Sequence, residues 1–556
     1  GDSILFRRGD VFTGQIILTR SGSPSSRIVF SAYGTGDLPV IRGSLPVSGW
    51  TRYSGSIWVA ASPRAGIQAT DFFINGKSQQ MGRYPNADAV NNGYLNIDSH
   101  TGSTGVVSSS LGSTRNWTGG EAVIRTRRWI LDRVPIQSHS GNTLSFGKPA
   151  SHEIYNNYGF FIQNHLGTLD QNGEWYFDAS TDRLYLFSSS DPNLSVSEVT
   201  CHESNFLSQN NSYFSILNLE FTGSSMTGIR VEGGSYYEIR NCRILNSGQD
   251  AVVVSGSSYP AIINNQIKNV NTNAVKVIRC TNASVKSNRI ENIAMRAGMG
   301  ILYHGIILNP GCSACIVENN VLDKIGSCGI YFTGNNISIS KNLIQNFCNV
   351  LDDGAGIYTT GYDGSILYND RNIAGNIVLN GAGAGMGTDK PAYTAAEGIY
   401  LDDRTINVQV RNNTVANCSR GIFVHNASRI SIIQNTLFNN NEQILFVDNG
   451  AAISHPVNQC IVRENVFFSK YLSQTVASFE TVDNRFSNFG SFDYNYYCRP
   501  MDDYATILTR YTTGSGSVSD LIDLKTWQST YGLDLNSYKS PAAISAYGVI
   551  SRSGSN

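Results

Sequence analysis

A short apolar run recurs through the middle of this 556-residue chain and limits its fold more than any other feature of the sequence. The runs begin at Gly228, Ala251, Ala274, Gly305, Gly329, Gly356, Gly398, Gly421 and Gln443. Their spacing is about 23 residues, interrupted by three insertions. Apolar and polar positions alternate within the runs, which is the period of a β-strand. Because one such repeat cannot bury its apolar face alone, the pattern predicts a solenoid of stacked coils.

A second strand follows each run and opens with an asparagine. These asparagines are Asn265, Asn288, Asn320, Asn342, Asn376, Asn413, Asn435 and Asn465. Amide side chains stacked at one turn of successive coils hydrogen-bond along the stack and satisfy backbone groups that the bend leaves unpaired. Leucine-rich repeats share the period, but their leucine consensus is absent here. The sequence therefore predicts an all-β fold, a right-handed parallel β-helix with an asparagine ladder.

The low charge of the chain narrows the range of its partners. Only 15% of the residues are charged, and 41 Lys and Arg balance 42 Asp and Glu. This composition excludes a nucleic-acid binder that relies on a basic surface. No apolar run approaches the roughly 18 residues of a membrane span. Abundant Gly, Asn, Ser and Tyr favour a sparsely charged partner such as a carbohydrate. We therefore expect a protein that binds a carbohydrate and has no nucleic-acid or membrane partner. We expect it to be a monomer.

The cysteines indicate neither a disulfide scaffold nor a metal site. Ten cysteines are too few for such a scaffold in a chain of this length, and those within the coils are expected to be buried thiols. Cys312 and Cys315 form a C-x-x-C pair, but no second pair at zinc spacing accompanies it. We therefore predict no metal and no cofactor. The chain starts at Gly1 without a leader, as exported chains do after processing, which favours a secreted or periplasmic location.

The extent of the repeat predicts four segments. Residues 1–70 are predicted to form the first coils and a cap, and residues 199–500 the main parallel β-helix that carries the site. Residues 71–198 lose the repeat and contain aromatic strands, which predicts an inserted β-rich subdomain. After about residue 500 the repeat fades, so residues 501–556 are expected to form a C-terminal cap.

Acidic residues concentrate on two consecutive coils. Asp352 and Asp353 precede one apolar run, Glu397 precedes the next, and Asp402 and Asp403 end it. Neighbouring coils stack about 4.8 Å apart, so these acids can approach the roughly 5 to 9.5 Å that separates the carboxyl groups of glycosidases. Glycoside hydrolysis needs one protonated carboxyl to supply a proton and one ionised carboxyl to attack or to activate water.

Five stretches of sequence are distinctive. They are GDSILFRRGD at the start, GRYPN at 82–86, NGEWYFD with RLYLF within 172–187, DDGAGIY at 352–358 and GIYLDD at 398–403. Together they resemble the parallel β-helix glycoside hydrolases, in particular families 120 and 141, over most of the chain. The resemblance implies that two carboxylates on the outside of the solenoid cleave glycosidic bonds, and it favours Asp353 and Asp402. It also implies fucosides or xylosides of plant or algal polysaccharides as substrates.

The register of the coils leaves a second catalytic pair open. Asp353 lies three residues before the glycine of its run, whereas Asp402 lies four residues after the corresponding glycine. A bend must therefore bring these two side chains together. Glu397 lies one residue before its glycine and is nearer to Asp353 in this alignment. Asp353 with Asp402 and Asp353 with Glu397 are both candidate pairs.

Aligning the coils on their glycines produces an outward column with an aromatic stretch. The column contains Arg230, Val253, Lys276, Ile307, Tyr331, Tyr358, Tyr400 and Phe423. Tyr358 and Tyr400 are candidate substrate-binding residues beside Asp402, as a sugar-stacking platform or as a ladder that only stabilises the solenoid. Trp129, in the predicted insert, either walls the cleft or holds the subdomain together.

Four more residues are candidate substrate-binding groups. His304 and His425 could each hold a sugar hydroxyl. Asp352 and Asp403 accompany the catalytic candidates in sequence. The alternatives are that Asp352 caps a turn and that Asp403 pairs with Arg404 on the surface.

Two other functions remain open from the sequence. A polysaccharide lyase needs a basic residue beside a uronate, and Arg230 and Lys276 of the outward column could serve, although several coils separate them from the acids. These basic residues would also tolerate a sulfated or uronic chain as the substrate of a hydrolase. A non-catalytic glycan-binding solenoid needs no carboxylate pair.

Overall fold

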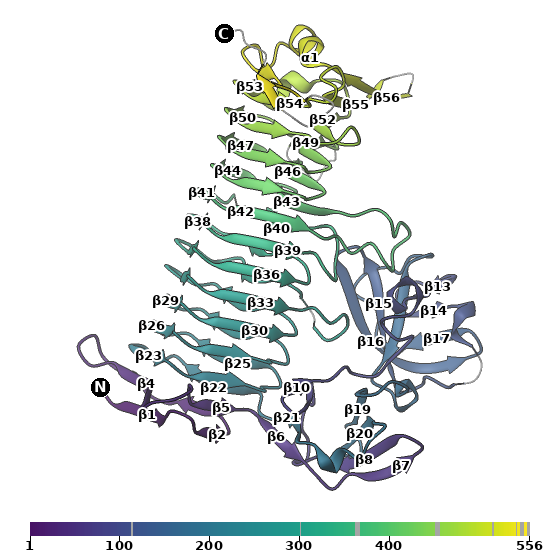
Figure 1. The fold of residues 1–556 in the computed structure, drawn as a ribbon, viewed down its shortest axis with the longest axis vertical. Coiled ribbons are helices and arrows are strands. Elements are labelled where there is room, and N and C mark those ends of the chain that lie inside the picture. The colour runs from purple at the N-terminus through teal and green to yellow at the C-terminus, as the bar shows by residue number, and fades with distance from the viewer. Residues whose placement is uncertain are drawn as a thin grey trace.

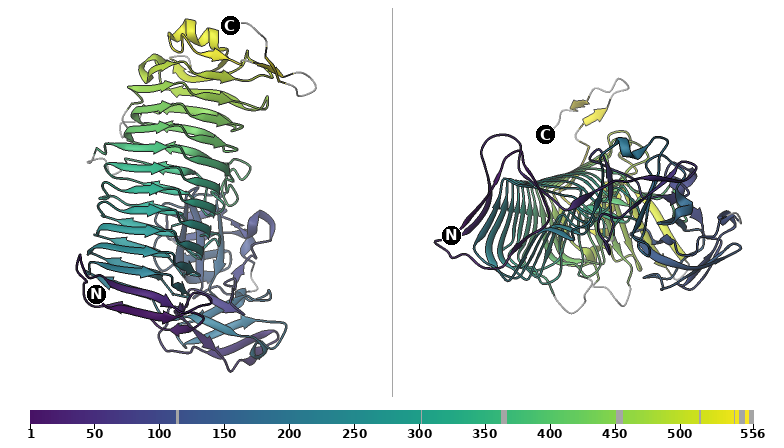
Figure 2. Two further views of the ribbon diagram at one scale, coloured as in Figure 1. Left: turned by 60° about the vertical axis from the view of Figure 1, so that its left-hand side comes forward. Right: turned by 90° about the horizontal axis from the view of Figure 1, so that it is seen from below.

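The chain folds into a long solenoid that carries a β-rich subdomain on one side (Figures 1 and 2). The computed structural model describes residues 1–112, 115–300, 302–361, 367–450, 456–513, 516–540, 542–544 and 550–552. Among these residues there is one α-helix, α1 (Leu524–Tyr531), at the C-terminal end of the solenoid. The N-terminal strands form the opposite end.

Three parallel sheets form the walls of the solenoid. We call one of them the site sheet; it starts at β3 (Ile16–Leu18) and β22 (Ser204–Gln209). Its middle strands are β25 (Thr227–Glu232), β28 (Val252–Ser255), β31 (Val275–Ile278), β34 (Ile306–Leu308), β37 (Ile330–Phe332), β40 (Gly354–Thr359), β43 (Ala396–Leu401), β46 (Arg420–His425) and β49 (Glu442–Asp448). Tyr331 pairs with Tyr358, Tyr358 with Tyr400 and Tyr400 with Phe423, as the alignment on glycines predicted. The predicted parallel β-helix is confirmed.

The other two sheets complete each coil. One runs from β1 (Ser3–Arg7) to β53 (Gly490–Asp493). The other runs from β2 (Val11–Thr13) to β57 (Tyr538–Lys539) and includes β33 (Arg289–Ile293), β39 (Leu343–Phe347) and β42 (Ile377–Gly381). The inward side chains of all three sheets make one continuous apolar core. Ile399 and Leu401, for example, are fully buried on the inner face of β43.

The predicted asparagine ladder runs along one corner of this core. Asn265 accepts the backbone N–H of Cys242. From Asn288 on, each ladder asparagine accepts, on Oδ1, the backbone N–H and the side-chain Nδ2–H of the asparagine one coil before it. The ladder includes every asparagine that the sequence singled out and continues to Asn495. The corner of the solenoid therefore has few unpaired buried amides, as closed packing demands.

Removing one ladder residue is expected to destabilise the fold strongly. Asn376 is fully buried and bonds to Asn342, to Asn413 and to the carbonyl of Ile339. Asn376→Ala leaves these buried groups without hydrogen-bond partners. Each unsatisfied group costs about 1–3 kcal/mol of stability, so the free energy of unfolding should fall by roughly 3 kcal/mol. Urea unfolding followed by circular dichroism measures this change. The exposed Asn488, changed to Ala, is the control, and an equal effect of the two substitutions would contradict the role of the ladder.

The inserted subdomain leaves the solenoid after β5 (Val40–Arg42), earlier than the expected boundary at residue 70, and β22 re-enters it. Its largest sheet has eight strands, including the hairpin of β15 (Glu121–Arg127) and β16 (Ile130–Ser140). Trp117, Ile124 and Phe160 form part of its separate core. This hairpin lies beside the middle coils of the solenoid (Figure 1).

The C-terminal segment covers the end of the solenoid core. Trp527 of α1 is fully buried and stacks on Phe479 at 4.6 Å. The hairpin of β55 (Ile507–Thr513) and β56 (Gly516–Ile522) extends the site sheet: β55 is added in parallel and β56 antiparallel to β55. All ten cysteines are buried and free. No described helix has the length and apolar character needed to cross a membrane.

Candidate active site

A cleft of about 1000 Å³ lies between the outer face of the site sheet and the inserted subdomain. The hairpin of β15 and β16 lines one wall. The solenoid wall includes seven of the nine candidate site residues, which are His304, Asp353, Tyr358, Tyr400, Asp402, Asp403 and His425. The other two, Asp352 and Glu397, are buried and do not line the cleft.

Asp353 lies immediately before β40, in a turn of the backbone. Its φ of +54° is a left-handed conformation, uncommon for residues other than glycine, and it supplies the bend that the sequence register required. Burial, followed by the negative charges of Asp402 and Asp352, raises the pKa of Asp353 to about 6. A carboxyl with this pKa keeps its proton in mildly acidic solution and can deliver it to a leaving group.

Asp402 follows the last residue of β43 and is held by two side chains. The Tyr358 hydroxyl donates to Oδ2 at 2.6 Å, and Nδ1 of His425 lies 2.8 Å from Oδ1. Burial acts to raise the pKa of Asp402, but the hydrogen bonds from His425 and Tyr358 outweigh it, and the pKa falls below the usual value. At pH values between these two pKa values, Asp402 is therefore ionised while Asp353 is still protonated.

His425 and Asp403 complete this end of the cleft. Burial acts to lower the pKa of His425, but its hydrogen bond to Asp402 and the charge of that carboxylate raise it. Asp403 accepts a hydrogen bond from Asn426 Nδ2 at 2.7 Å, and one of its oxygens lies 3.6 Å from His425 Nδ1. The hydrogen bond and charge of His425 therefore support Asp402 as an anion, and the charge of Asp403 contributes to the raised pKa of His425.

Glu397 lies behind the cleft and has a different environment. Its side chain is almost fully buried and pairs with Arg420 at 2.5 Å. Arg420 also donates to the Tyr393 hydroxyl and lies 3.7 Å from Glu442. Burial raises the pKa of Glu397, and the charge of Arg420 opposes this effect. The geometry thus brings Asp353 and Asp402 to the cleft and commits Glu397 to an ion pair.

Asp352 links the turn at Asp353 to the inserted subdomain. One carboxylate oxygen accepts the backbone N–H groups of Asp353 (3.0 Å) and Ala395 (2.7 Å), and the other pairs with Arg128. The backbone N–H of Asp352 donates to the Arg128 carbonyl at 3.0 Å. Asp352 therefore caps the turn, which is one of the two roles that the sequence left open. It is fully buried and does not line the cleft.

Loss of the Arg128 side chain is expected to disturb Asp353. The positive charge of Arg128 lowers the pKa of Asp353, so Arg128→Met should move the alkaline limb of the pH–activity profile upward and lower kcat by about tenfold through a loosened turn. Arg127→Met is the matched control, because Arg127 bonds to the carbonyls of Thr126 and Glu153. A profile with an unmoved alkaline limb would contradict this role.

The aromatic column forms a ladder. His304 stacks on Tyr331 at 5.4 Å and 19°, and Tyr331 stacks on Tyr358 at 5.3 Å and 20°. Tyr400 stacks on Phe423 at 4.6 Å and 17°. Between these two stacks, Tyr358 and Tyr400 meet edge to face at 5.2 Å and 87°. Burial and the nearby charge of Lys276 lower the pKa of His304 to about 4, so this ring is neutral at ordinary pH.

The opposite wall supplies Trp129, which the sequence offered either as a cleft wall or as a support of the subdomain, and three residues that the sequence did not single out. Trp129, at the tip of the β15–β16 hairpin, is 47% exposed and lines the cleft. Arg133, Lys148 and His152 line it as well. No repeat connects these residues to the solenoid, so only the packing of the subdomain decides that they line the cleft. Trp129 thus places a partly exposed aromatic ring, of the kind on which sugars stack, in the cleft wall.

The basic residues proposed for a lyase lie elsewhere. Arg230 pairs with Glu232, and Lys276 lies 3.7 Å from Asp250. Neither residue lines the cleft. Among the described residues, Asp402, Asp403 and His425 offer potential metal-ligand atoms within 4.8 Å of one another. The 2.8 Å hydrogen bond between His425 and Asp402 already uses the imidazole nitrogen that faces these carboxylates.

A family comparison identifies the architecture. Residues 184–304 and 299–467 match the family described as the right-handed β-helix region. The chain belongs to this family. The match spans the coils that carry Asp353 and Asp402, and it agrees with the right-handed parallel β-helix expected from the repeat. No curated protein matches the chain.

Solved structures with the same architecture come from several carbohydrate-related proteins. A structure described as "Glycoside hydrolase" is 13% identical, with a TM-score of 0.59 over 78% of this chain and 87% of that chain. A GH136 lacto-N-biosidase from Eubacterium ramulus is 11% identical, with a TM-score of 0.36 over 86% of this chain and 59% of that one. The A-module of mannuronan C-5 epimerase AlgE6 from Azotobacter vinelandii is 13% identical, with a TM-score of 0.35 over 61% and 84%. At 13% identity, the similarity to the first of these structures shows the fold alone, because one β-helix supports several chemistries.

Proposed function

We propose that the protein is a glycoside hydrolase in which Asp353 donates a proton and Asp402 is the ionised partner. The observation that carries this proposal is that two carboxyl groups of one cleft have pKa values shifted in opposite directions. Paired carboxyl groups with divided protonation states are what glycoside hydrolysis requires. The similarity of the fold to a glycoside hydrolase supports the proposal.

The mechanism follows from the two environments. The protonated Asp353 carboxyl transfers its proton to the glycosidic oxygen as the bond to the departing sugar breaks. The Asp402 carboxylate, held by Tyr358 and His425, attacks the anomeric carbon or takes a proton from the attacking water. The exposed Trp129 ring stacks against the apolar face of a bound sugar from the opposite wall.

The proposed substrate class follows from the sequence resemblance. The motifs similar to families 120 and 141 favour a plant or algal polysaccharide or oligosaccharide that contains fucose, xylose or sulfated sugars. We propose that the protein meets this substrate as a secreted or periplasmic monomer. No metal or cofactor takes part in the proposed chemistry.

The test is an activity screen on plant and algal polysaccharides and aryl glycosides. Wild-type protein is compared with Asp353→Asn and Asp402→Asn, with and without a metal chelator, and both new reducing ends and ultraviolet absorbance of unsaturated products are recorded. Reducing ends without absorbance, lost in both variants and retained with the chelator, are the expected result. Absorbance that survives both substitutions would identify a lyase, and binding without any product would identify a glycan-binding solenoid; either result overturns the proposal.

A further inference from the structure

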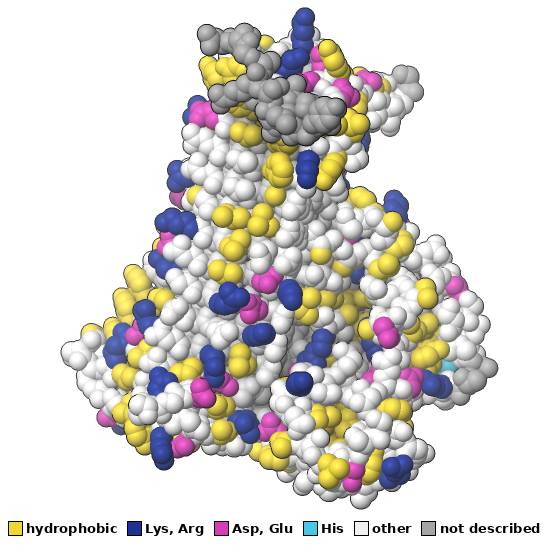
Figure 3. Space-filling model, in the orientation of Figure 1, with side chains coloured by type: hydrophobic (Ala, Val, Ile, Leu, Met, Phe, Trp, Pro, Cys, Tyr) yellow, Lys and Arg dark blue, Asp and Glu magenta, His cyan; other side chains and the backbone are white. Residues whose placement is uncertain are grey.

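A second cavity, of about 370 Å³, lies between the inserted subdomain and the turns that follow β33, β39 and β42. It shares no lining residue with the catalytic cleft. On the face of the molecule shown in Figure 3, Lys and Arg side chains gather around a hollow between the solenoid and the subdomain. Three arginines line the cavity, Arg83 and Arg125 from the subdomain and Arg296 from the solenoid.

Arg83 is buried without a carboxylate partner for its guanidinium group among the described residues. It is 5% exposed, and its Nε donates to the Pro85 carbonyl at 3.0 Å. Its Nη2 donates to the carbonyls of Asn92 and Gly93. Burial lowers the pKa of Arg83 to about 10, so the group is still charged at neutral pH. Its guanidinium group therefore donates to neutral carbonyl groups and lies over the Phe161 ring at 3.6 Å, and the charge of Glu174 acts on it without forming an ion pair.

Arg125 repeats this arrangement on the same cavity. It is 1% exposed, and its Nη1 donates to the carbonyls of Val350 (3.2 Å) and Met386 (3.1 Å). Its Nη2 donates to the Arg128 carbonyl at 2.6 Å. The Nε–H of Arg125 is buried with no hydrogen-bond partner among the described residues, and such an orphaned donor on a charged group is costly.

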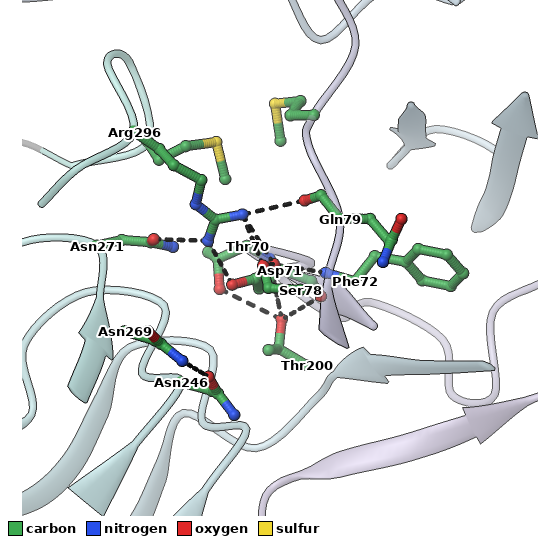
Figure 4. A network of polar contacts seen from close by, with 12 residues as sticks. Thr70, Asp71, Phe72, Ser78, Gln79, Thr200, Asn246, Asn269, Asn271 and Arg296 are labelled. Carbon is green, nitrogen blue, oxygen red and sulfur yellow. Dashed lines mark hydrogen bonds and ion pairs between the residues drawn. The ribbon is translucent and has the colours of Figure 1, made fainter. Parts of the chain in front are cut away.

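The acids near the cavity are already engaged. Asp71 pairs with Arg296 and also accepts from Ser78, in the network that Figure 4 shows. Glu174 accepts three backbone N–H groups, those of Arg83, Asp170 and Gln171. Asp352 pairs with Arg128. The charges of Glu174 and Asp352 act on Arg83 and Arg125, respectively, but no described acid forms an ion pair with either arginine.

We propose that this cavity binds an anionic oxygen group, a carboxylate or a sulfate, between Arg83 and Arg125. Buried charges persist in proteins when they are paired, and guanidinium groups match the geometry of oxyanions. The volume admits a single sugar unit that carries such a group as well as the free anion. The inference does not depend on the catalytic proposal, because the two cavities have no residue in common.

The experiment titrates the wild-type protein with sodium sulfate and with galacturonate, and follows the melting temperature and the heat of binding. Sodium chloride at equal ionic strength and neutral galactose are the controls. We expect a saturable rise of at least about 2 °C with the anions. A response to sulfate but not to galacturonate would assign a free inorganic anion, whereas a response to both would assign an acidic sugar; both support an anion site.

An aspartate introduced into the cavity by mutation tests whether the anion binds there, and it leaves every arginine in place. Ala384 lines the cavity, so Ala384→Asp should raise the melting temperature without added anion and abolish the saturable response. Two control variants should keep the saturable response. Ala384→Asn introduces a side chain of the same size as aspartate without its charge. Ala382→Asp introduces the same charge at an exposed position of the same loop. Sulfate also stabilises folded proteins generally, without saturation, so the same unsaturable rise in all four proteins would overturn the proposal.

Discussion

Asp402→Asn is expected to lower kcat/KM by roughly 10⁴-fold on every substrate that the protein cleaves. The amide keeps the size of the carboxyl but has no negative charge to attack the anomeric carbon or to activate water. The fold should survive, because the amide oxygen can still accept the hydrogen bond that Tyr358 donates to Asp402. Initial rates on the substrate found by the screen, with a melting curve for each protein, measure the effect.

The neighbouring acid provides the control for this prediction. Asp403 lines the same cleft but bonds to Asn426 and lacks the hydrogen bond from Tyr358. Asp403→Asn should cost less than about tenfold in kcat/KM. Equal losses in the two variants would mean that the Asp402–Asp403 corner binds substrate as a unit, which would contradict the assignment of Asp402.

Asp353→Asn is expected to lower kcat by roughly 10²- to 10⁴-fold when the leaving group is a sugar, because departure of a sugar alkoxide needs a proton. With an aryl glycoside whose leaving group is a stable anion, the loss should be much smaller. Asp402→Asn should show no such recovery. A loss in Asp353→Asn that is independent of the leaving group would contradict its role as the acid.

The pH profile supplies a second check on Asp353. Wild-type activity needs Asp402 ionised and Asp353 protonated. Because the pKa of Asp402 lies below its usual value and that of Asp353 is about 6, activity should rise with pH in the acid range and fall as pH increases through about 6. Asp353→Asn should lose the alkaline limb when assayed on the aryl glycoside. An alkaline limb that persists in this variant would belong to another group.

The local repeat predicted those parts of the structure that depend on one coil and its neighbour. Parallel stacking places equivalent positions one above another, so aligning the glycines was sufficient to predict the pairing of Tyr331, Tyr358 and Tyr400 and the course of the asparagine ladder. The same alignment could not choose between Glu397 and Asp402 as the partner of Asp353. That choice depends on the left-handed turn at Asp353 and on the ion pair with Arg420 that holds Glu397 behind the cleft.

Sequence by itself determined the solenoid and the coils on which the acids meet, because hydrophobic periodicity and amide stacking act between neighbouring repeats. Only the tertiary structure decided what faces those acids. The inserted subdomain brings Arg128 to Asp352 and Trp129 to the far wall of the cleft, although more than 200 residues separate Arg128 from Asp352. Contacts of this kind arise from the packing of two separate cores, and no periodic signal in the chain encodes them. The division of protons between Asp353 and Asp402 has the same origin, since burial and neighbouring charges in the folded cleft set both pKa values.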